Sequence, residues 1–75
     1  MRTGTFTAQA WRGENLVSES VGVEYTAAKI IADAWTAAGC TSRLMSEGVD
    51  YCEVYMPDGS SRTGSWAETT RIIAA

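Results

Sequence analysis

The sequence predicts an α+β fold in two layers, an antiparallel sheet of four to five strands with one main helix across one face. Three observations predict it. Apolar and polar residues alternate near the N-terminus, the apolar period lengthens to that of a helix in the middle, and alternation returns in the last third between turn-forming residues. A chain of 75 residues has room for a single domain, residues 1–75, with a small core.

The first two elements are predicted to be strands joined as a hairpin. The stretch from 3 to 11 alternates, and its apolar side carries Phe6, Ala8 and Ala10. "RGEN" at 12–15 supplies residues that suit a reversing turn. "LVSESVGVEY" at 16–25 then resumes the alternation, with one side formed by Val17, Val21 and Val23.

The next stretch, "TAAKIIADAWTAAGC" at 26–40, has the period of a helix. One stripe along this helix consists of Ala27, Ile30, Ile31, Ala34 and Ala38. Thr26 is the predicted N-cap, and Gly39 follows where a glycine commonly closes a helix. Lys29 and Asp33 lie one turn apart on the opposite side, and we expect them to stay in solvent.

Strands and turns alternate after the helix. We expect strands at 41–46, 49–56 and 60–66, separated by turns at "EG", 47–48, and at "PDG", 57–59. Ser65 and Glu68 form the S-x-x-E pattern of a capping box, which predicts a short terminal helix over 67–75. The alternative for this segment is a strand, because Ile72 and Ile73 are β-branched and nine residues are too few to be helical unaided.

The strand at 49–56 has two different sides, and residue parity predicts which one is buried. The first side carries Cys52, Val54 and Met56. Glu53 lies mid-strand on the other side, where burying a carboxylate would be costly, so we expect the first side to face the main helix. One helix covers one face only, which leaves Tyr51 and Tyr55 on an uncovered face.

This uncovered face is a candidate contact surface for a protein partner. Tyr, Trp and Arg are enriched at binding hot spots, and an open sheet face is a flat platform for them. The candidate contact residues are Trp11, Tyr51, Tyr55, Arg62 and Trp66. The alternative is that these rings pair across strands only to stabilise a small sheet.

The distribution of charge argues against nucleic acid and membranes as partners. Nine acidic and six basic residues give a net charge of −3, and the basic residues are scattered singly, whereas nucleic-acid binders show a basic patch or stripe. No apolar run approaches the roughly 18 to 20 residues that span a bilayer, and the N-terminus lacks the apolar segment of a signal peptide. We therefore expect a cytoplasmic protein.

The residue types that catalysis and metal binding need are scarce. The sequence has no histidine, so neither a Ser-His-Asp nor a Cys-His arrangement is possible within the chain. Cys40 and Cys52 are expected to be buried free thiols, and two cysteines cannot complete a four-ligand zinc site. No glycine-rich phosphate-binding motif is present. We expect a protein that is not an enzyme and that uses no metal or cofactor.

The order of the elements suggests a resemblance. An N-terminal strand region leads into one alanine-rich helix that ends near a cysteine, and "RLMSEGVDYCEVYMPDGSSRTGSW" at 43–66 follows. In size and element order, over most of its length, this outline resembles small anti-CRISPR proteins carried by phages and mobile elements. The resemblance implies a non-catalytic inhibitor that docks on a host defence complex, in the cytosol of the host cell.

Three functions remain open from the sequence. The leading hypothesis is a small non-enzymatic protein-binding module, of the phage-encoded inhibitor type. The second is a structural or accessory subunit that self-associates, as a homodimer for example, through an open sheet edge. The third is a weak single-stranded nucleic-acid binder that stacks bases on its aromatic rings.

Overall fold

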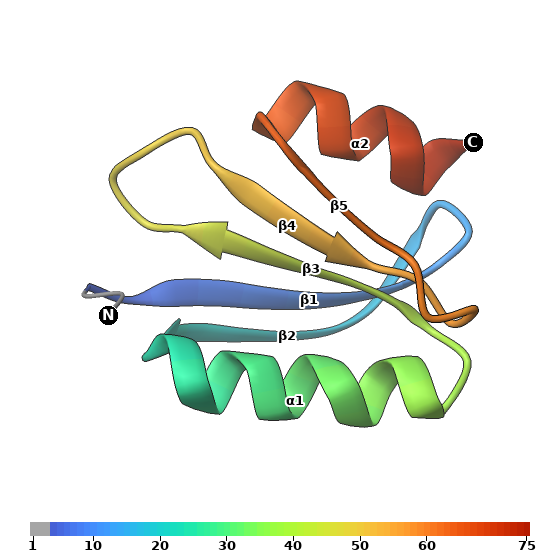
Figure 1. Cartoon of the computed structure of the whole chain (residues 1–75), viewed down its shortest axis with the longest axis horizontal. Coiled ribbons are helices and arrows are strands. Elements are labelled where there is room, and N and C mark those ends of the chain that lie inside the picture. Colours follow the sequence, from blue (N-terminus) through green and yellow to red (C-terminus); the bar gives the residue numbers. More distant parts are fainter. Residues whose placement is uncertain (1–3) are drawn as a thin grey trace.

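The computed structural model describes residues 4–75, in which five strands form one antiparallel sheet and two helices pack against it (Figure 1). The strands lie side by side in the order β2-β1-β3-β4-β5. The elements are β1 Phe6–Arg12, β2 Asn15–Val23, α1 Tyr25–Ala37, β3 Thr41–Ser46, β4 Cys52–Tyr55, β5 Ser61–Gly64 and α2 Trp66–Ala74. The predicted fold class is confirmed. The predicted start of the first strand, at Thr3, lies outside the described residues.

The N-terminal hairpin forms as predicted, but β2 departs from regular alternation. Gly13 takes a φ of 60° in the turn, and the apolar side of β1 is buried at Phe6, Ala8 and Ala10. The register between β1 and β2 shifts twice, so the predicted common side of Val17, Val21 and Val23 is wrong. Val17 and Val21 are 50% and 67% exposed, whereas Val23 packs against the core, because bulges break the two-residue period.

Helix α1 connects β2 to β3 and lies across one face of the sheet, here called the α1 face (Figure 1). The core on this face consists of Phe6, Ala8, Ala28, Ala32 and Leu44. Ala28 and Ala32 have no exposed surface, and their small side chains let the helix approach the sheet closely. The Ser42 hydroxyl on β3 donates a hydrogen bond to the Ala32 carbonyl at 3.1 Å, which confirms this close approach.

The ends of α1 match the prediction at one end only. At the C-terminal end, Gly39 has a φ of 93° and its N–H binds the Thr36 carbonyl, so the expected closing glycine is confirmed. At the start, Glu24 and not Thr26 is the N-cap, and it makes no side-chain cap. The helix therefore begins at Tyr25, whose ring packs edge-on against Phe6 at 5.2 Å between ring centres. This contact, rather than a capping side chain, holds the first turn.

The predicted apolar stripe of α1 is not the buried one. Ile30 is 65% exposed, and Ala34 and Ala38 are exposed as well. The buried residues of the helix are Ala28 and Ala32, each one position after a member of the predicted stripe. They face the sheet because alanine allows closer packing on it than isoleucine does.

The second face of the sheet is covered too, which corrects the expectation that only one face would be. Helix α2 contacts β5, β4 and β3, and it packs on the face opposite α1 (Figure 1). Its capping box is confirmed, since the Glu68 N–H donates to the Ser65 hydroxyl at 3.1 Å and the Ser65 N–H donates to the Glu68 carboxylate at 2.8 Å. The terminal segment is therefore a helix rather than a strand, and it begins at Trp66.

The assignment of the two sides of β4 to the two faces was wrong in part. Cys52 and Val54 are buried as predicted, at 2% and 0% exposure, but they lie under α2 and not under the main helix. Glu53 and Tyr55 face α1 instead, and Glu53 is only 3% exposed. The expectation failed because hydroxyl groups compensate the buried carboxylate, as described below.

Candidate binding pocket between Trp11 and Trp66

The five predicted contact residues do not form one surface. Trp11 and Trp66 meet on the face under α2, here called the α2 face, whereas Tyr51 and Tyr55 lie on the α1 face around Glu53. Arg62 is exposed on β5, the strand at one edge of the sheet. The expected uncovered aromatic face therefore does not exist, and two separate clusters replace it.

Arg43 lies at the centre of the α2 face. It is only 2% exposed, and its guanidinium carbon lies 5.6 Å from the centre of the Trp11 ring and 5.2 Å from that of Trp66. Both distances are within the range of a cation–π interaction. The cation is therefore held between two indole rings, one from β1 and one from the first residue of α2.

The hydrogen bonds of Arg43 all go to uncharged acceptors. Its Nε and Nη2 atoms donate to the side-chain oxygen of Gln9, at 3.1 and 3.0 Å, and Gln9 is the direct cross-strand neighbour of Arg43 on β1. Its Nη1 atom donates to the hydroxyls of Thr70 at 2.7 Å and Thr69 at 3.2 Å, and to the Trp66 carbonyl at 3.4 Å. Strand β1 and helix α2 thus fix the guanidinium from two sides.

Among residues 4–75, no carboxylate lies within ion-pair distance of Arg43. The nearest connection to one runs through Gln9, whose amide nitrogen donates to Glu19 at 2.8 Å. Burial lowers the pKa of Arg43 below its usual value, and the interaction with Cys52 opposes this shift. A guanidinium nevertheless stays protonated in proteins. The α2 face therefore contains a buried positive charge that only neutral groups solvate.

A pocket of about 230 Å³ opens beside this cation. It is lined by Trp11, Glu14, Arg43, Trp66, Thr70, Ile73 and Ala74. The walls come from the β1–β2 hairpin and from α2, so the pocket lies between two segments that are far apart in the sequence. We call it the tryptophan pocket.

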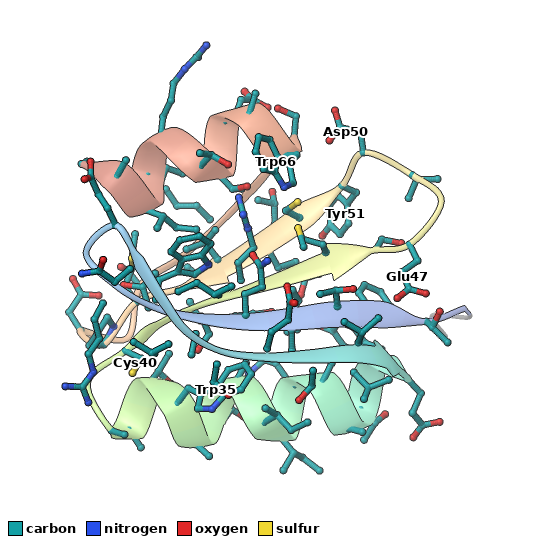
Figure 2. The ribbon with its side chains drawn as sticks, turned by 180° about the vertical axis from the view of Figure 1, so that it is seen from behind. Trp35, Cys40, Glu47, Asp50, Tyr51 and Trp66 are labelled. Carbon is teal, nitrogen blue, oxygen red and sulfur yellow. The ribbon has the colours of Figure 1, made fainter. Side chains whose placement is uncertain are left out.

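The position of Trp66 is fixed from outside the pocket. Its backbone N–H donates to the carboxylate of Asp50 at 2.7 Å, and Figure 2 shows both residues at the start of α2. A carboxylate at a helix N-terminus is stabilised by the unpaired N–H groups and the helix dipole. Trp66 as a whole is 52% exposed although its backbone is anchored.

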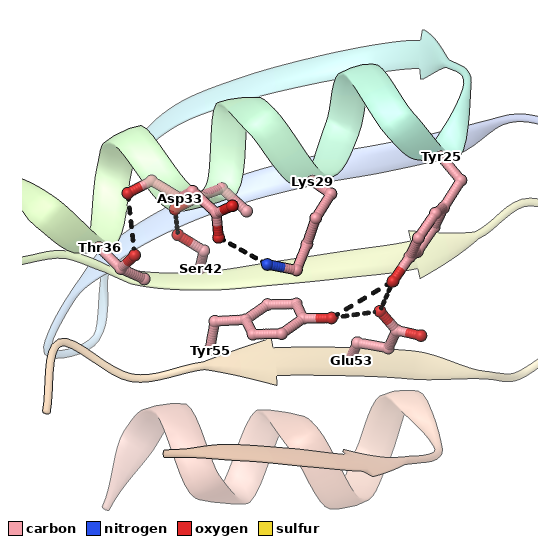
Figure 3. Close-up of polar contacts among 8 residues, drawn as sticks. Tyr25, Lys29, Asp33, Thr36, Ser42, Glu53 and Tyr55 are labelled. Carbon is pink, nitrogen blue, oxygen red and sulfur yellow. Dashed lines mark hydrogen bonds and ion pairs between the residues drawn. The ribbon is translucent and has the colours of Figure 1, made fainter. Parts of the chain in front are cut away.

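A second cluster surrounds the buried Glu53 on the α1 face (Figure 3). Its carboxylate accepts hydrogen bonds from the hydroxyls of Tyr25 at 2.9 Å, Tyr51 at 2.8 Å and Tyr55 at 2.6 Å. Burial, followed by the hydrogen bonds to Glu53 and Tyr25, raises the pKa of Tyr55 well above its ordinary value. The Lys29 amine lies 4.5 Å from the centre of the Tyr55 ring and pairs with Asp33 at 2.6 Å. These groups close the α1 face, so this cluster is structural in character.

The two cysteines are both buried and free, as predicted. Cys52 lies near Thr69 and Arg43, and burial raises the pKa of its thiol although both neighbours oppose the shift. A raised pKa keeps the thiol protonated and unreactive at neutral pH.

The sequence reasoning missed the central residue of the pocket. Neither Arg43 nor its hydrogen-bond partner Gln9 is among the contact residues predicted from the sequence. The sequence does contain one indication. Arg43 is next to the apolar Leu44 in the middle of a strand, so the two side chains point to opposite faces of the sheet. Such a position indicates a buried cation once the second face of the sheet is known to be covered.

Comparison with known proteins adds no family, since no family model, no curated protein and no solved structure matches the chain. Within residues 4–75, neither helix has the length and apolar character needed to cross a membrane.

Proposed function

We propose that the chain is a small non-enzymatic module that binds a partner protein through the tryptophan pocket. The observation that carries this proposal is that two tryptophans and one arginine, the residue types most enriched at binding hot spots, meet at a preformed pocket. Ile73 and Ala74 add apolar wall, so the pocket suits a side chain of a partner. Hot-spot residues typically fill or frame such desolvated pockets.

The rigidity of the walls supports the same function. Trp11 belongs to a strand paired on both sides, and its indole N–H donates to Gln9 at 3.2 Å. Trp66 is tied to Asp50 through its backbone. Because these rings are already ordered, binding would cost little side-chain entropy.

Loss of one ring tests the proposal. We expect Trp66→Ala to weaken partner binding by about 2 kcal/mol or more, roughly 30-fold, without loss of the fold, because the residue is 52% exposed. The matched control is Ile30→Ala, which removes a side chain of similar exposure from α1 and should leave binding unchanged. The measurement is capture of proteins from a bacterial lysate, followed by affinity measurement with each captured protein. A partner that binds Trp66→Ala as well as the wild-type chain would refute the pocket as the contact.

The resemblance to anti-CRISPR proteins makes the proposal more specific. We propose a host CRISPR surveillance complex as the partner, with the chain acting as an inhibitor of it. The resemblance in size and element order supports this choice of partner. Expression in a bacterium with active CRISPR interference should restore plaques of a targeted phage, and Trp66→Ala should abolish the effect. If CRISPR interference is unchanged, the surveillance complex is not the partner, and the proposal of a binding module stands without it.

One observation favours self-association as a second candidate. Strand β2 is nine residues long and lies at an edge of the sheet, with Leu16 at 45%, Val17 at 50% and Val21 at 67% exposure. An exposed edge of this length can pair with the same edge of a second copy. Light scattering should then give twice the mass of 8.1 kDa, and Val21→Lys should restore a monomer. A monomeric wild-type chain at micromolar concentration would exclude it.

A further inference from the structure

We infer that the tryptophan pocket captures the C-terminal residue of a partner chain, with its free carboxylate on Arg43 and its apolar side chain between the rings of Trp11 and Trp66. This inference rests on the proposed function and names the chemistry of the partner. Two independent properties of the pocket lead to it, the charge balance at Arg43 and the size and lining of the cavity.

The charge balance calls for an anion. A guanidinium has five N–H donors, and the bonds to Gln9, Thr69, Thr70 and the Trp66 carbonyl engage Nε, Nη1 and one hydrogen of Nη2. Nη2 carries two hydrogens and makes one hydrogen bond within residues 4–75, to Gln9. Arg43 also lines the pocket, and no carboxylate of the described residues pairs with it. A partner carboxylate would therefore complete both the hydrogen bonding and the charge of a buried cation.

The size and lining of the pocket call for an apolar group beside that anion. A cavity of about 150 Å³ is enough for a benzene ring, and small-molecule sites usually exceed about 300 Å³. The tryptophan pocket, at about 230 Å³, lies between these values and fits one side chain with its carboxylate. A C-terminal residue carries both groups on one Cα atom. An internal Asp or Glu brings a carboxylate but leaves the walls at Ile73 and Ala74 without an apolar partner.

The surroundings favour a peptide terminus over a nucleic acid phosphate. Glu14 lines the pocket, Glu19 lies behind Gln9, and the whole chain carries a net charge of −3. These negative charges repel a single carboxylate less than they repel a nucleic acid, which carries many phosphates. A single carboxylate can also contact Arg43 directly.

The test uses the three tryptophans as reporters in NMR spectra of the full chain. The indole N–H signals of Trp11 and Trp66 report on the pocket, whereas Trp35, on α1 against the opposite face, serves as the internal reference (Figure 2). The probes are N-acetyl-glycyl-phenylalanine with a free C-terminus, the same peptide as its C-terminal amide, N-acetyl-glycyl-glutamate amide, and a thymidine dinucleotide with a 5′-phosphate. We expect the free acid to shift Trp11 and Trp66 but not Trp35, and to bind at least about tenfold more tightly than its amide.

A charge variant that leaves the cavity intact sharpens the test. Glu14 is exposed in the turn between β1 and β2, so Glu14→Gln removes one negative charge from the rim. At low ionic strength the variant should bind the free acid about twofold more tightly and the amide unchanged. Weaker binding of the acid by Glu14→Gln would count against a carboxylate in the pocket.

Each other outcome has a defined meaning. Equal binding of acid and amide would overturn the carboxylate but leave the apolar pocket, and with it the proposed function, in place. Preferential binding of the glutamate amide or of the dinucleotide would overturn the choice of a chain terminus. If no probe shifts either tryptophan, the inference fails, whereas the proposed function fails only if a captured partner also binds Trp66→Ala normally.

Discussion

The two faces of the sheet each bury one charged residue, and they do so with opposite signs. The α1 face buries Glu53 and the α2 face buries Arg43, at 3% and 2% exposure. The two residues lie on neighbouring strands but never meet, because Glu53 is paired with Leu44 and Arg43 with Val54 across the same ladder. The alternation of side chains places the backbone of the sheet between them.

The difference between the faces lies in how far each is closed. On the α1 face, the thirteen-residue helix covers the apolar cluster, and tyrosine hydroxyls bind the carboxylate. On the α2 face, the nine-residue helix leaves a pocket beside the cation. A short second helix thus covers Cys52 and Val54 while Arg43 still lines an open pocket.

The largest expected effect is the loss of stability when a buried apolar side chain is shortened on either face. Leu44→Ala, in the core under α1, should lower the free energy of unfolding by about 3 kcal/mol, and Val54→Ala, under α2, by about 2 kcal/mol, because the larger side chain leaves the larger cavity. Ile30→Ala, at an exposed position, should change it by less than about 0.5 kcal/mol. Urea denaturation of the three variants gives these values. A larger loss for Val54→Ala than for Leu44→Ala would show that the main core lies under α2.

The elements that the sequence predicted well depend on local signals. Gly39 closes α1, and the pair Ser65 and Glu68 starts α2, through contacts within a few residues of the chain. The strands at 41–46 and around Cys52–Tyr55 follow from alternation between turn residues. These signals determine where elements begin and end, and they are visible without any tertiary contact.

The faces were harder to predict because their partners are distant in the sequence. Glu53 is buried because a hydroxyl from Tyr25, 28 residues away, binds it, and Arg43 because Gln9, 34 residues away, accepts from it. A single sequence gives the cost of burying such charges but not the groups that compensate it. The candidate residues Trp11 and Trp66 were therefore found by residue type, whereas their grouping around Arg43 was not.

The second largest expected effect is the loss of stability when Glu53, on the α1 face, loses one of its hydrogen-bond donors. Tyr55→Phe removes the hydroxyl that donates to Glu53 at 2.6 Å and keeps the ring, so we expect a loss of about 1 to 1.5 kcal/mol at neutral pH. The measurement is the urea midpoint of each chain. A variant as stable as the wild type would mean that the remaining donors fully satisfy Glu53.

The same variant should change the alkaline stability. The pKa of Tyr55 is raised in the folded chain, so the unfolded chain loses this proton first, and stability is fully present below about pH 10 and falls as the pH rises above it. The pKa of Cys52 is also raised in the folded chain, so this residue too lowers the stability as the pH rises, and its effect begins at a lower pH than that of Tyr55. Urea midpoints between about pH 8 and pH 11 should therefore decline less steeply for Tyr55→Phe than for the wild type. Parallel declines would indicate that Tyr55 ionises as easily in the folded chain as in the unfolded one.

The smallest effect should loosen the α2 face alone. Ser65→Ala removes the side chain that caps α2, which typically costs about 1 kcal/mol, and it also removes the acceptor for the Glu68 N–H. Because α2 contacts the sheet mainly through β3, β4 and β5, whereas α1 packs mainly on β1 and β3 across the other face, we expect faster hydrogen exchange in α2 while the amides of α1 change little. Trp66 and the acceptors of Arg43 on α2 would then be held less firmly, and the affinity of the free-acid peptide should fall with the protection of α2. Equal loss of protection in both helices would show instead that the two faces open as one cooperative unit, so that a partner seated on Arg43 would stabilise the α1 core as strongly as its own face.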